Sequence, residues 1–249
     1  MDNRGTSSLE KTGWNRTGMV TAPLMAREVT ESAAAAPPTS AGGTQALLTR
    51  RSEYIEEGFP LGSLPPPPLS LQGIVEGAAQ VVGMTTGVAT LLDKLSERAA
   101  FERTGTRLYD ALIGKCAALD DTSPGPTLAE LQEIREDELR HFLLVNSAIT
   151  TLGGDPTVMS PCADTVTVSS LGLIQVLTDP RTNVAQCLQA ILTAELTDND
   201  GWQMLINLAE ELGHADMATE FRAALANEER HLANVRGWLQ EQVRAQARV

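Results

Sequence analysis

The sequence contains few of the residues that mark a disulfide-stapled or membrane-spanning protein. Its three cysteines, Cys116, Cys162 and Cys187, are scattered and form no Cys-x-x-Cys pair, so we interpret them as reduced, mostly buried thiols. No run of about eighteen apolar residues occurs, which argues against a transmembrane helix. The N-terminal stretch also lacks the apolar segment of a signal peptide. These absences predict a cytoplasmic protein.

Basic and aromatic residues are scarce as well. The chain has 19 lysines and arginines against 32 aspartates and glutamates, a formal net charge of -13. This balance argues against a nucleic-acid partner and against an anionic membrane, because both bind basic surfaces. Aromatic residues make up only 4% of the chain, and no segment alternates as a β-strand does, so we expect an all-α protein.

The first 70 residues differ in composition from the rest. They contain the stretches "AAAAPPTSAGG" and "GSLPPPPLS" and few residues that could form a core. Such segments cannot bury enough apolar surface to offset the entropy of ordering. We therefore predict a disordered, low-complexity tail over 1–70 and one folded domain over 71–249.

Four long apolar stripes with helical spacing follow the tail. They run over about 88–116, 127–152, 184–212 and 221–239. The second begins with Thr127 and Glu130, the pattern of a capping box. The connection over 155–181 is long, with a short helix expected in "SSLGLIQVLTD", whereas the other connections are short. This order predicts a four-helix bundle with one long crossover.

A glutamate stands in the middle of each stripe, where an apolar residue would be expected. The four are Glu102, Glu138, Glu195 and Glu228. A buried carboxylate without a partner is costly, and four together would repel one another unless cations neutralise them. Two of the chain's three histidines follow these glutamates in Glu-x-x-His pairs, at His141 and His231. Four glutamates and two histidines are the ligand set of a dinuclear iron or manganese site in a helical bundle.

The chain also matches itself. "ERTGTRLYDAL" (102–112) aligns with "ELTDNDGWQML" (195–205), and the two Glu-x-Arg-His segments align with each other. The pattern indicates two related helix hairpins, each supplying half of a pseudo-symmetric site.

With these motifs, the region 88–243 resembles the ferritin-like superfamily of ferritins, bacterioferritins, rubrerythrins and manganese catalases. The resemblance implies metal ligation by the six residues, with Glu138 and Glu228 bridging the metals. Tyr109 stands where bacterioferritins and rubrerythrins place a tyrosine near the site, whose hydroxyl could hydrogen-bond a ligand carboxylate. Asp198 stands where rubrerythrin-like proteins carry an extra glutamate, but it is one methylene shorter, so we favour a supporting role over direct ligation.

Further details of the resemblance concern the residues before the two Glu-x-x-His pairs. Asp137 resembles the family's aspartate that orients a ligand imidazole, and Asn227 departs from that pattern at the matching place. The Cys-x-x-Cys pairs of a rubredoxin-type iron centre and the haem-ligating methionine of bacterioferritins are not present. A fifth helix, typical of ferritin cages, has no room after 243.

The resemblance implies an enzyme, a di-metal oxidoreductase with two iron ions or manganese in their place. It would react with O2 or H2O2 in ferroxidase or rubrerythrin-like peroxidase chemistry, each metal giving up one electron. Three alternatives stay open: a manganese catalase, an iron-storage or cargo protein, and a metal-free structural bundle. A homo-oligomer is compatible with each of them.

One segment of the tail suggests a partner. Residues 59–64, within "FPLGSLPPPP", are similar to the Leu-x-x-Gly-Ser-Leu peptides that load ferritin-like cargo into encapsulin shells. The alternative interpretation is a proline-rich linker.

Overall fold

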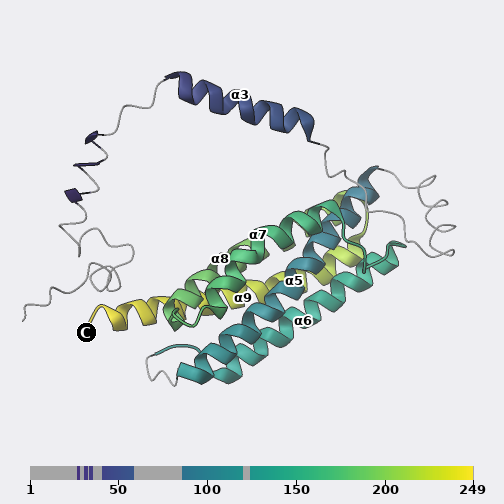
Figure 1. Cartoon of the computed structure of the whole chain (residues 1–249). Coiled ribbons are helices and arrows are strands. Elements are labelled where there is room, and N and C mark those ends of the chain that lie inside the picture. Colours follow the sequence, from purple (N-terminus) through teal and green to yellow (C-terminus); the bar gives the residue numbers. More distant parts are fainter. Residues whose placement is uncertain are drawn as a thin grey trace, which may run out of the picture. The chain divides into compact units, whose positions relative to one another are not determined.

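The computed structural model describes residues 27–28, 31–32, 34–35, 41–58, 86–119 and 124–248 (Figure 1). Segment 59–64, the candidate shell-loading peptide, lies outside these residues. The chain divides into two units, Met1–Pro60 and Leu61–Val249, which we describe separately. No helix in the described part of the chain is long and apolar enough to cross a membrane.

The first unit contains helix α3, Ala41–Glu57. Its 17 residues lie within 1–70, the region expected to be a mostly disordered tail, where the sequence analysis named no helix. Alanine, leucine, glutamine, arginine and glutamate all favour helix, and Arg50 pairs with Glu53 at 3.2 Å one turn apart. Leu47, Leu48 and Ile55 are nevertheless exposed.

The second unit contains the four predicted long helices. They are α5 (Thr86–Leu119), α6 (Leu128–Thr151), α8 (Val184–Glu211) and α9 (Ala215–Gln246). Helices α5 and α6 pack as one hairpin and α8 and α9 as another, and α5 also contacts α8 (Figure 1). The described residues form no strand. The all-α bundle expected from the sequence is therefore confirmed.

Local signals in the sequence account for the helix ends. Thr127 accepts a hydrogen bond from the Glu130 backbone, and the Glu130 side chain accepts one from the Thr127 backbone, which is the predicted capping box. Helix α8 begins with a second capping box, formed by Asn183 and Gln186. The tight turn into α9 passes through Gly213, whose positive φ of 83° suits glycine.

The crossover contains a longer helix than expected. Helix α7 spans Pro161–Thr178, 18 residues, in place of a short helix within 169–179. Its start has a recognisable signal, because Ser160 caps the helix and Pro161 occupies its first turn. Helix α7 packs along α5 and also contacts α8, so it covers one side of the bundle.

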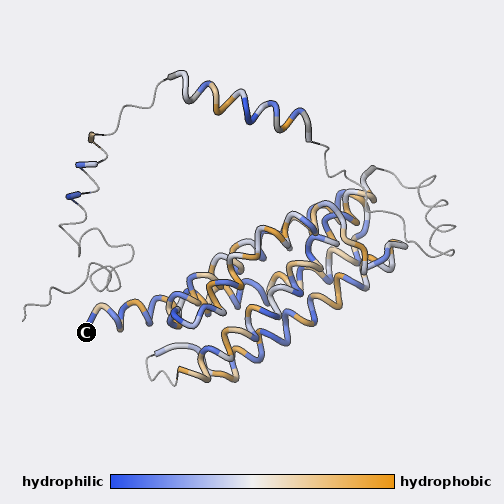
Figure 2. The backbone as a smooth tube through the Cα atoms, viewed as in Figure 1, coloured by the Kyte–Doolittle hydropathy of each residue, from blue (hydrophilic) through white to orange (hydrophobic). Residues whose placement is uncertain are grey.

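Apolar residues form two clusters, one towards each end of the bundle. One contains Leu112, Leu131, Leu188 and Trp238, and the other contains Leu95, Ile149, Leu205 and Phe221. On α6, α8 and α9 these clusters lie on opposite sides of the buried polar positions at the middle of the helix. Figure 2 shows the corresponding mixture of hydrophobic and hydrophilic residues along each helix. The fold therefore places a layer of buried polar side chains between two apolar layers.

Candidate metal centre

The polar layer contains the six predicted ligands and one further acid, all from the four long helices. Each of the seven residues is at most 3% exposed. They are Glu102, Glu138, His141, Glu195, Asp198, Glu228 and His231. Regular helix geometry explains the convergence, because residues three apart on one helix face the same way. His141 follows Glu138 on α6, and His231 follows Glu228 on α9, so each hairpin contributes its histidine beside a glutamate.

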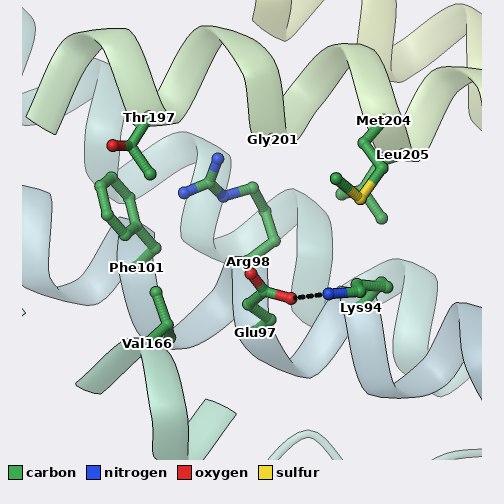
Figure 3. Close-up of a pocket in the computed structure, with 9 residues that line it drawn as sticks. All are labelled: Lys94, Glu97, Arg98, Phe101, Val166, Thr197, Gly201, Met204 and Leu205. Atoms are coloured by element: carbon green, nitrogen blue, oxygen red, sulfur yellow. Dashed lines mark hydrogen bonds and ion pairs between the residues drawn. The ribbon is translucent and has the colours of Figure 1, made fainter. Parts of the chain in front are cut away.

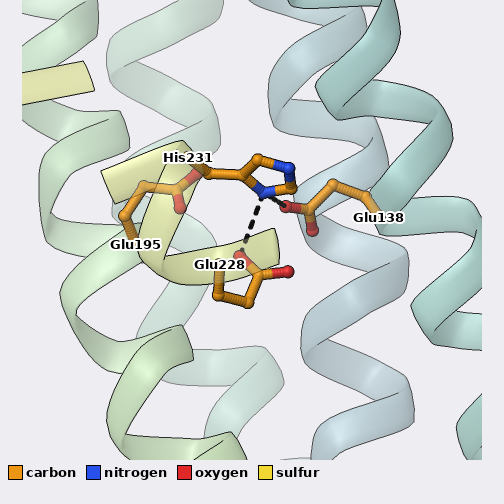
Figure 4. A group of neighbouring side chains, drawn as sticks. All are labelled: Glu138, Glu195, Glu228 and His231. Atoms are coloured by element: carbon orange, nitrogen blue, oxygen red, sulfur yellow. Dashed lines mark hydrogen bonds and ion pairs between the residues drawn. The ribbon is translucent and has the colours of Figure 1, made fainter. Parts of the chain in front are cut away.

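Glu228 lies at the middle of the group. Its Oε1 is 2.6 Å from His141 Nδ1, and its Oε2 is 3.2 Å from His231 Nδ1. His231 Nδ1 is also 3.9 Å from Glu138 Oε1 (Figure 4). Both imidazoles therefore direct Nδ1 towards the carboxylates, and Glu228 joins the two hairpins.

The potential ligand atoms form overlapping sets. In one set, Glu138, Glu195, Glu228 and His231 each offer an atom, and in another Glu102, His141 and Glu228 do so. Within each set the atoms lie within 4.8 Å of one another. A third set combines Asp198 with Glu102, Glu138 and Glu228. We call Glu102 with His141 the Glu102 half-site, and Glu195 with His231 the Glu195 half-site; Glu138 and Glu228 are shared.

The electrostatics of the carboxylates reflect burial and mutual repulsion. Burial and the charges of neighbouring carboxylates raise the pKa values of Glu102, Glu138 and Glu195 well above their usual range. Burial would also raise the pKa of Glu228, but hydrogen bonds with His141 and His231 outweigh it and lower the pKa to about 2. Without cations, the group therefore keeps Glu228 ionised and favours protons on other glutamates.

Tyr109 makes the contact expected from the resemblance. It is buried on α5, and its hydroxyl donates a hydrogen bond to Glu195 Oε1 on α8. Burial, followed by the charge of Glu195, raises the pKa of Tyr109 well above its usual value, so the phenol stays a donor. At the matching place on α8, Trp202 packs edge-on against the His141 ring, with centroids 5.5 Å apart.

Asp137 and Asn227 each contact the histidine of the opposite hairpin. Asp137 Oδ2 is 3.0 Å from His231 Nε2, and Asn227 Nδ2 is 3.4 Å from His141 Nε2. Burial opposes ionisation of Asp137, but the hydrogen bond and charge of His231 prevail and lower its pKa. An anionic partner at Nε2 fixes the tautomer that leaves Nδ1 free as a ligand atom. His231 has such a partner and His141 has an amide instead.

Arg98 was not identified from the sequence. It is 4% exposed, and its guanidinium contacts Asp198 Oδ1 at 2.9 Å and Glu102 Oε1 at 3.2 Å. It also lies over the Phe101 ring, 4.4 Å from the centroid. The available signal was its position four residues before Glu102, on the face that α5 buries.

Gly105 was also missed. A Cβ built on it would collide with the Glu138 carboxylate, whose Cδ lies 2.8 Å away. The missing side chain therefore leaves the space that this carboxylate occupies. The glycine's place three residues after Glu102 puts it on the same helix face, but sequence spacing does not reveal which side chain fills the gap.

Comparison with known proteins finds a family model that matches part of the bundle. Residues 126–244 match the model of the ferritin-like domain. No curated protein shows a significant similarity to the chain. One similar solved structure is described as "Crystal structure of ferritin like, diiron-carboxylate proteins from Bacillus anthracis str. Ames". It is 21% identical, and the match covers 63% of this chain and 99% of that one with a TM-score of 0.47. Residues 126–244 are thus similar to the ferritin-like domain.

Proposed function

We propose that this protein is a non-haem di-metal oxidoreductase that binds two iron ions and reacts with O2 or H2O2. The observation that carries the proposal is the pair of overlapping ligand sets that share Glu228. One carboxylate with an imidazole on each side of it is the arrangement that two adjacent divalent cations require. The proposed ligands are the six residues found from the sequence, Glu102, Glu138, His141, Glu195, Glu228 and His231.

The donor atoms fit such a group. Glu138 Oε2 and Glu195 Oε2 are buried and accept no hydrogen bond within the described residues. An unpartnered carboxylate oxygen in an apolar interior is strongly unfavourable, and a cation is the partner that removes the cost. Carboxylate oxygens and imidazole nitrogens suit iron and manganese, whereas a thiolate set would favour zinc or copper.

When bound, the two ions would supply one electron each to the oxidant, which is the chemistry that the side chains cannot supply themselves. The chain's own residues position the donors. Tyr109 holds one oxygen of Glu195, which leaves the other directed to the centre. Asp137 accepts a hydrogen bond from His231 Nε2, so Nδ1 is the ring nitrogen that would bind a cation. The apolar layers on both sides exclude bulk water from the carboxylates.

Elemental analysis of protein purified without chelators tests the metal content directly. We expect about two ions per chain, retained or taken up anaerobically from Fe(II). Oxidation of the Fe(II)-loaded protein by O2 and by H2O2 is then followed by absorbance in a stopped-flow instrument. Rapid release of O2 from H2O2, without an electron donor, would instead identify a manganese catalase.

Two substitutions test the ligands. Glu138→Ala removes a shared carboxylate, and His231→Ala removes one imidazole, so each variant should retain less than half of the wild-type metal. Glu136→Ala is the matched control, because Glu136 lies on the same helix but is exposed. Full metal binding in both ligand variants would contradict the proposal, and no uptake by the wild type would leave a structural bundle.

A further inference from the structure

An open pocket lies against the carboxylate layer between α5, α7 and α8. It is lined by Phe101 on α5, Val166 on α7, and Met204 and Leu205 on α8, with Arg98 between them (Figure 3). Met204 is 51% exposed, so the pocket reaches the surface. Arg98 therefore stands between this pocket and the cluster, and its guanidinium is the one cationic group that contacts cluster carboxylates among the described arginines and lysines.

The contacts of Arg98 are built into the fold. Beyond the two carboxylates, its Nη1 donates to the Asp198 backbone carbonyl at 3.1 Å. A Cβ added to Gly201 would collide with the guanidinium, whose Cζ lies 3.0 Å away, so the glycine on α8 makes room for it. The charges of Asp198 and Glu102 outweigh the opposing effect of burial and raise the pKa of Arg98 further. The arginine is thus a permanent, buried positive charge.

The charges of the layer balance only when Arg98 is counted. Five carboxylates meet there, from Asp198 and the four central glutamates. Arg98 cancels one of them, which leaves four negative charges for two divalent cations if both histidines are neutral. An uncompensated charge at short range in a protein interior interacts strongly with a bound cation. This balance therefore bears directly on how many cations the centre holds and how tightly it holds them.

The internal repeat supports a role for the pair. When Glu102 is aligned with Glu195, Arg98 corresponds to Ile191 and Asp198 corresponds to Gly105. The first half therefore carries an arginine where the second has an apolar residue, and the second half carries an aspartate where the first has glycine. The two charged residues contact each other, so they form one added ion pair rather than two separate departures from the repeat.

We propose that Arg98 is a positioning residue that acts as a fixed internal counter-ion. Its ion pair with Asp198 keeps that carboxylate from binding a cation. The four glutamates that remain carry the four negative charges that two divalent cations balance. This inference rests on the proposed function, because it presumes that the cluster binds metal. It assigns to Asp198 a fixed partner, and it explains why an extra acid lies beside the cluster without being needed as a ligand.

The test is a charge cycle on the purified protein, with Zn(II) affinity measured by chelator competition and melting temperature measured without metal. Arg98→Met releases Asp198 as a fifth carboxylate, so Zn(II) should bind at least about tenfold tighter while the metal-free protein melts about 10 °C lower. Asp198→Asn leaves Arg98 with excess positive charge, so Zn(II) should bind at least about tenfold weaker. The double variant restores the balance and should bind within about threefold of the wild type.

Two further variants separate charge from packing. Arg98→Lys keeps the charge and should retain wild-type affinity, and Lys94→Met removes a cation that lines the same pocket but pairs with Glu97. A purely structural role for Arg98 predicts that both single variants weaken binding and that the double variant is worse; that result would overturn the inference. If Arg98→Met does not fold, Asp198→Asn and the double variant still decide it. If the wild type binds no metal, the proposed function fails first.

Discussion

The two half-sites use the same ligands but differ in what surrounds them. In the Glu195 half-site, Tyr109 donates to the glutamate and Asp137 accepts from the histidine. In the Glu102 half-site, Arg98 contacts the glutamate and the amide of Asn227 lies beside the histidine. The anion beside His231 makes that imidazole a stronger donor to a cation. The cation beside Glu102 makes that carboxylate a weaker one. The internal repeat therefore gives the two half-sites the same ligand types, and their neighbouring residues make them differ.

This inequality predicts an order of filling. The first cation should enter the Glu195 half-site, and the second should enter the Glu102 half-site, because Glu102 is already paired with the positive charge of Arg98. The supporting residues act across the hairpins: Tyr109 and Asp137 belong to the first hairpin but contact ligands of the second. Each half-site is thus completed only when both hairpins have docked.

The largest change in the difference between the two half-sites should come from substituting the residues that contact the two histidines. Asp137→Asn removes the anion beside His231, and we expect about 10- to 100-fold weaker binding of the first cation. Asn227→Asp should strengthen binding of the second cation, so that the two cations bind with similar affinities. Anaerobic Mn(II) titration by calorimetry distinguishes these results, because two binding steps should merge into one in Asn227→Asp. Unchanged steps in both variants would contradict the asymmetry.

A smaller effect should follow from filling the space beside Glu138. Gly105→Ala places a methyl group against the shared carboxylate, and Glu138 must move. We expect about tenfold weaker binding of both cations, and a loss of about 1–3 kcal/mol in the free energy of unfolding. Gly114→Ala on the same helix is the control, because a Cβ there meets nothing within 4 Å. That variant should be as stable as the wild type or slightly more stable.

The smallest change is the loss of one hydrogen bond. Tyr109→Phe keeps the ring but leaves Glu195 Oε1 without its donor, so the first cation should bind several-fold weaker, a cost of about 1–2 kcal/mol. The second binding step provides the internal control, because Tyr109 contacts no residue of the Glu102 half-site through its hydroxyl. Equal weakening of both steps would show that the hydroxyl supports the whole layer instead.

The sequence predicted the elements that depend on periodicity. The four stripes, the capping box at Thr127 and the six clustered residues follow from helical spacing, which is a local property. The length of helix α7 was underestimated, because only the segment 169–179 was expected to be helical. Ser160 and Pro161 signalled the earlier start. Arg98 and Gly105 could not be assigned, because their roles depend on contacts with residues on other helices. The ligand roles themselves stay predictions until metal is measured.

Because the pKa values of the buried glutamates Glu102, Glu138 and Glu195 are raised, protons and metal ions should compete for these carboxylates. A carboxyl group whose pKa is raised by folding stabilises the protein below its unfolded pKa, and that contribution is lost as pH rises through the folded value. Burial also raises the pKa of Asp198, to about 7. The cation-free bundle should therefore become less stable as pH rises through neutrality, where deprotonation favours loading. A chain that meets acid would give up its ions and stay folded with protons in their place.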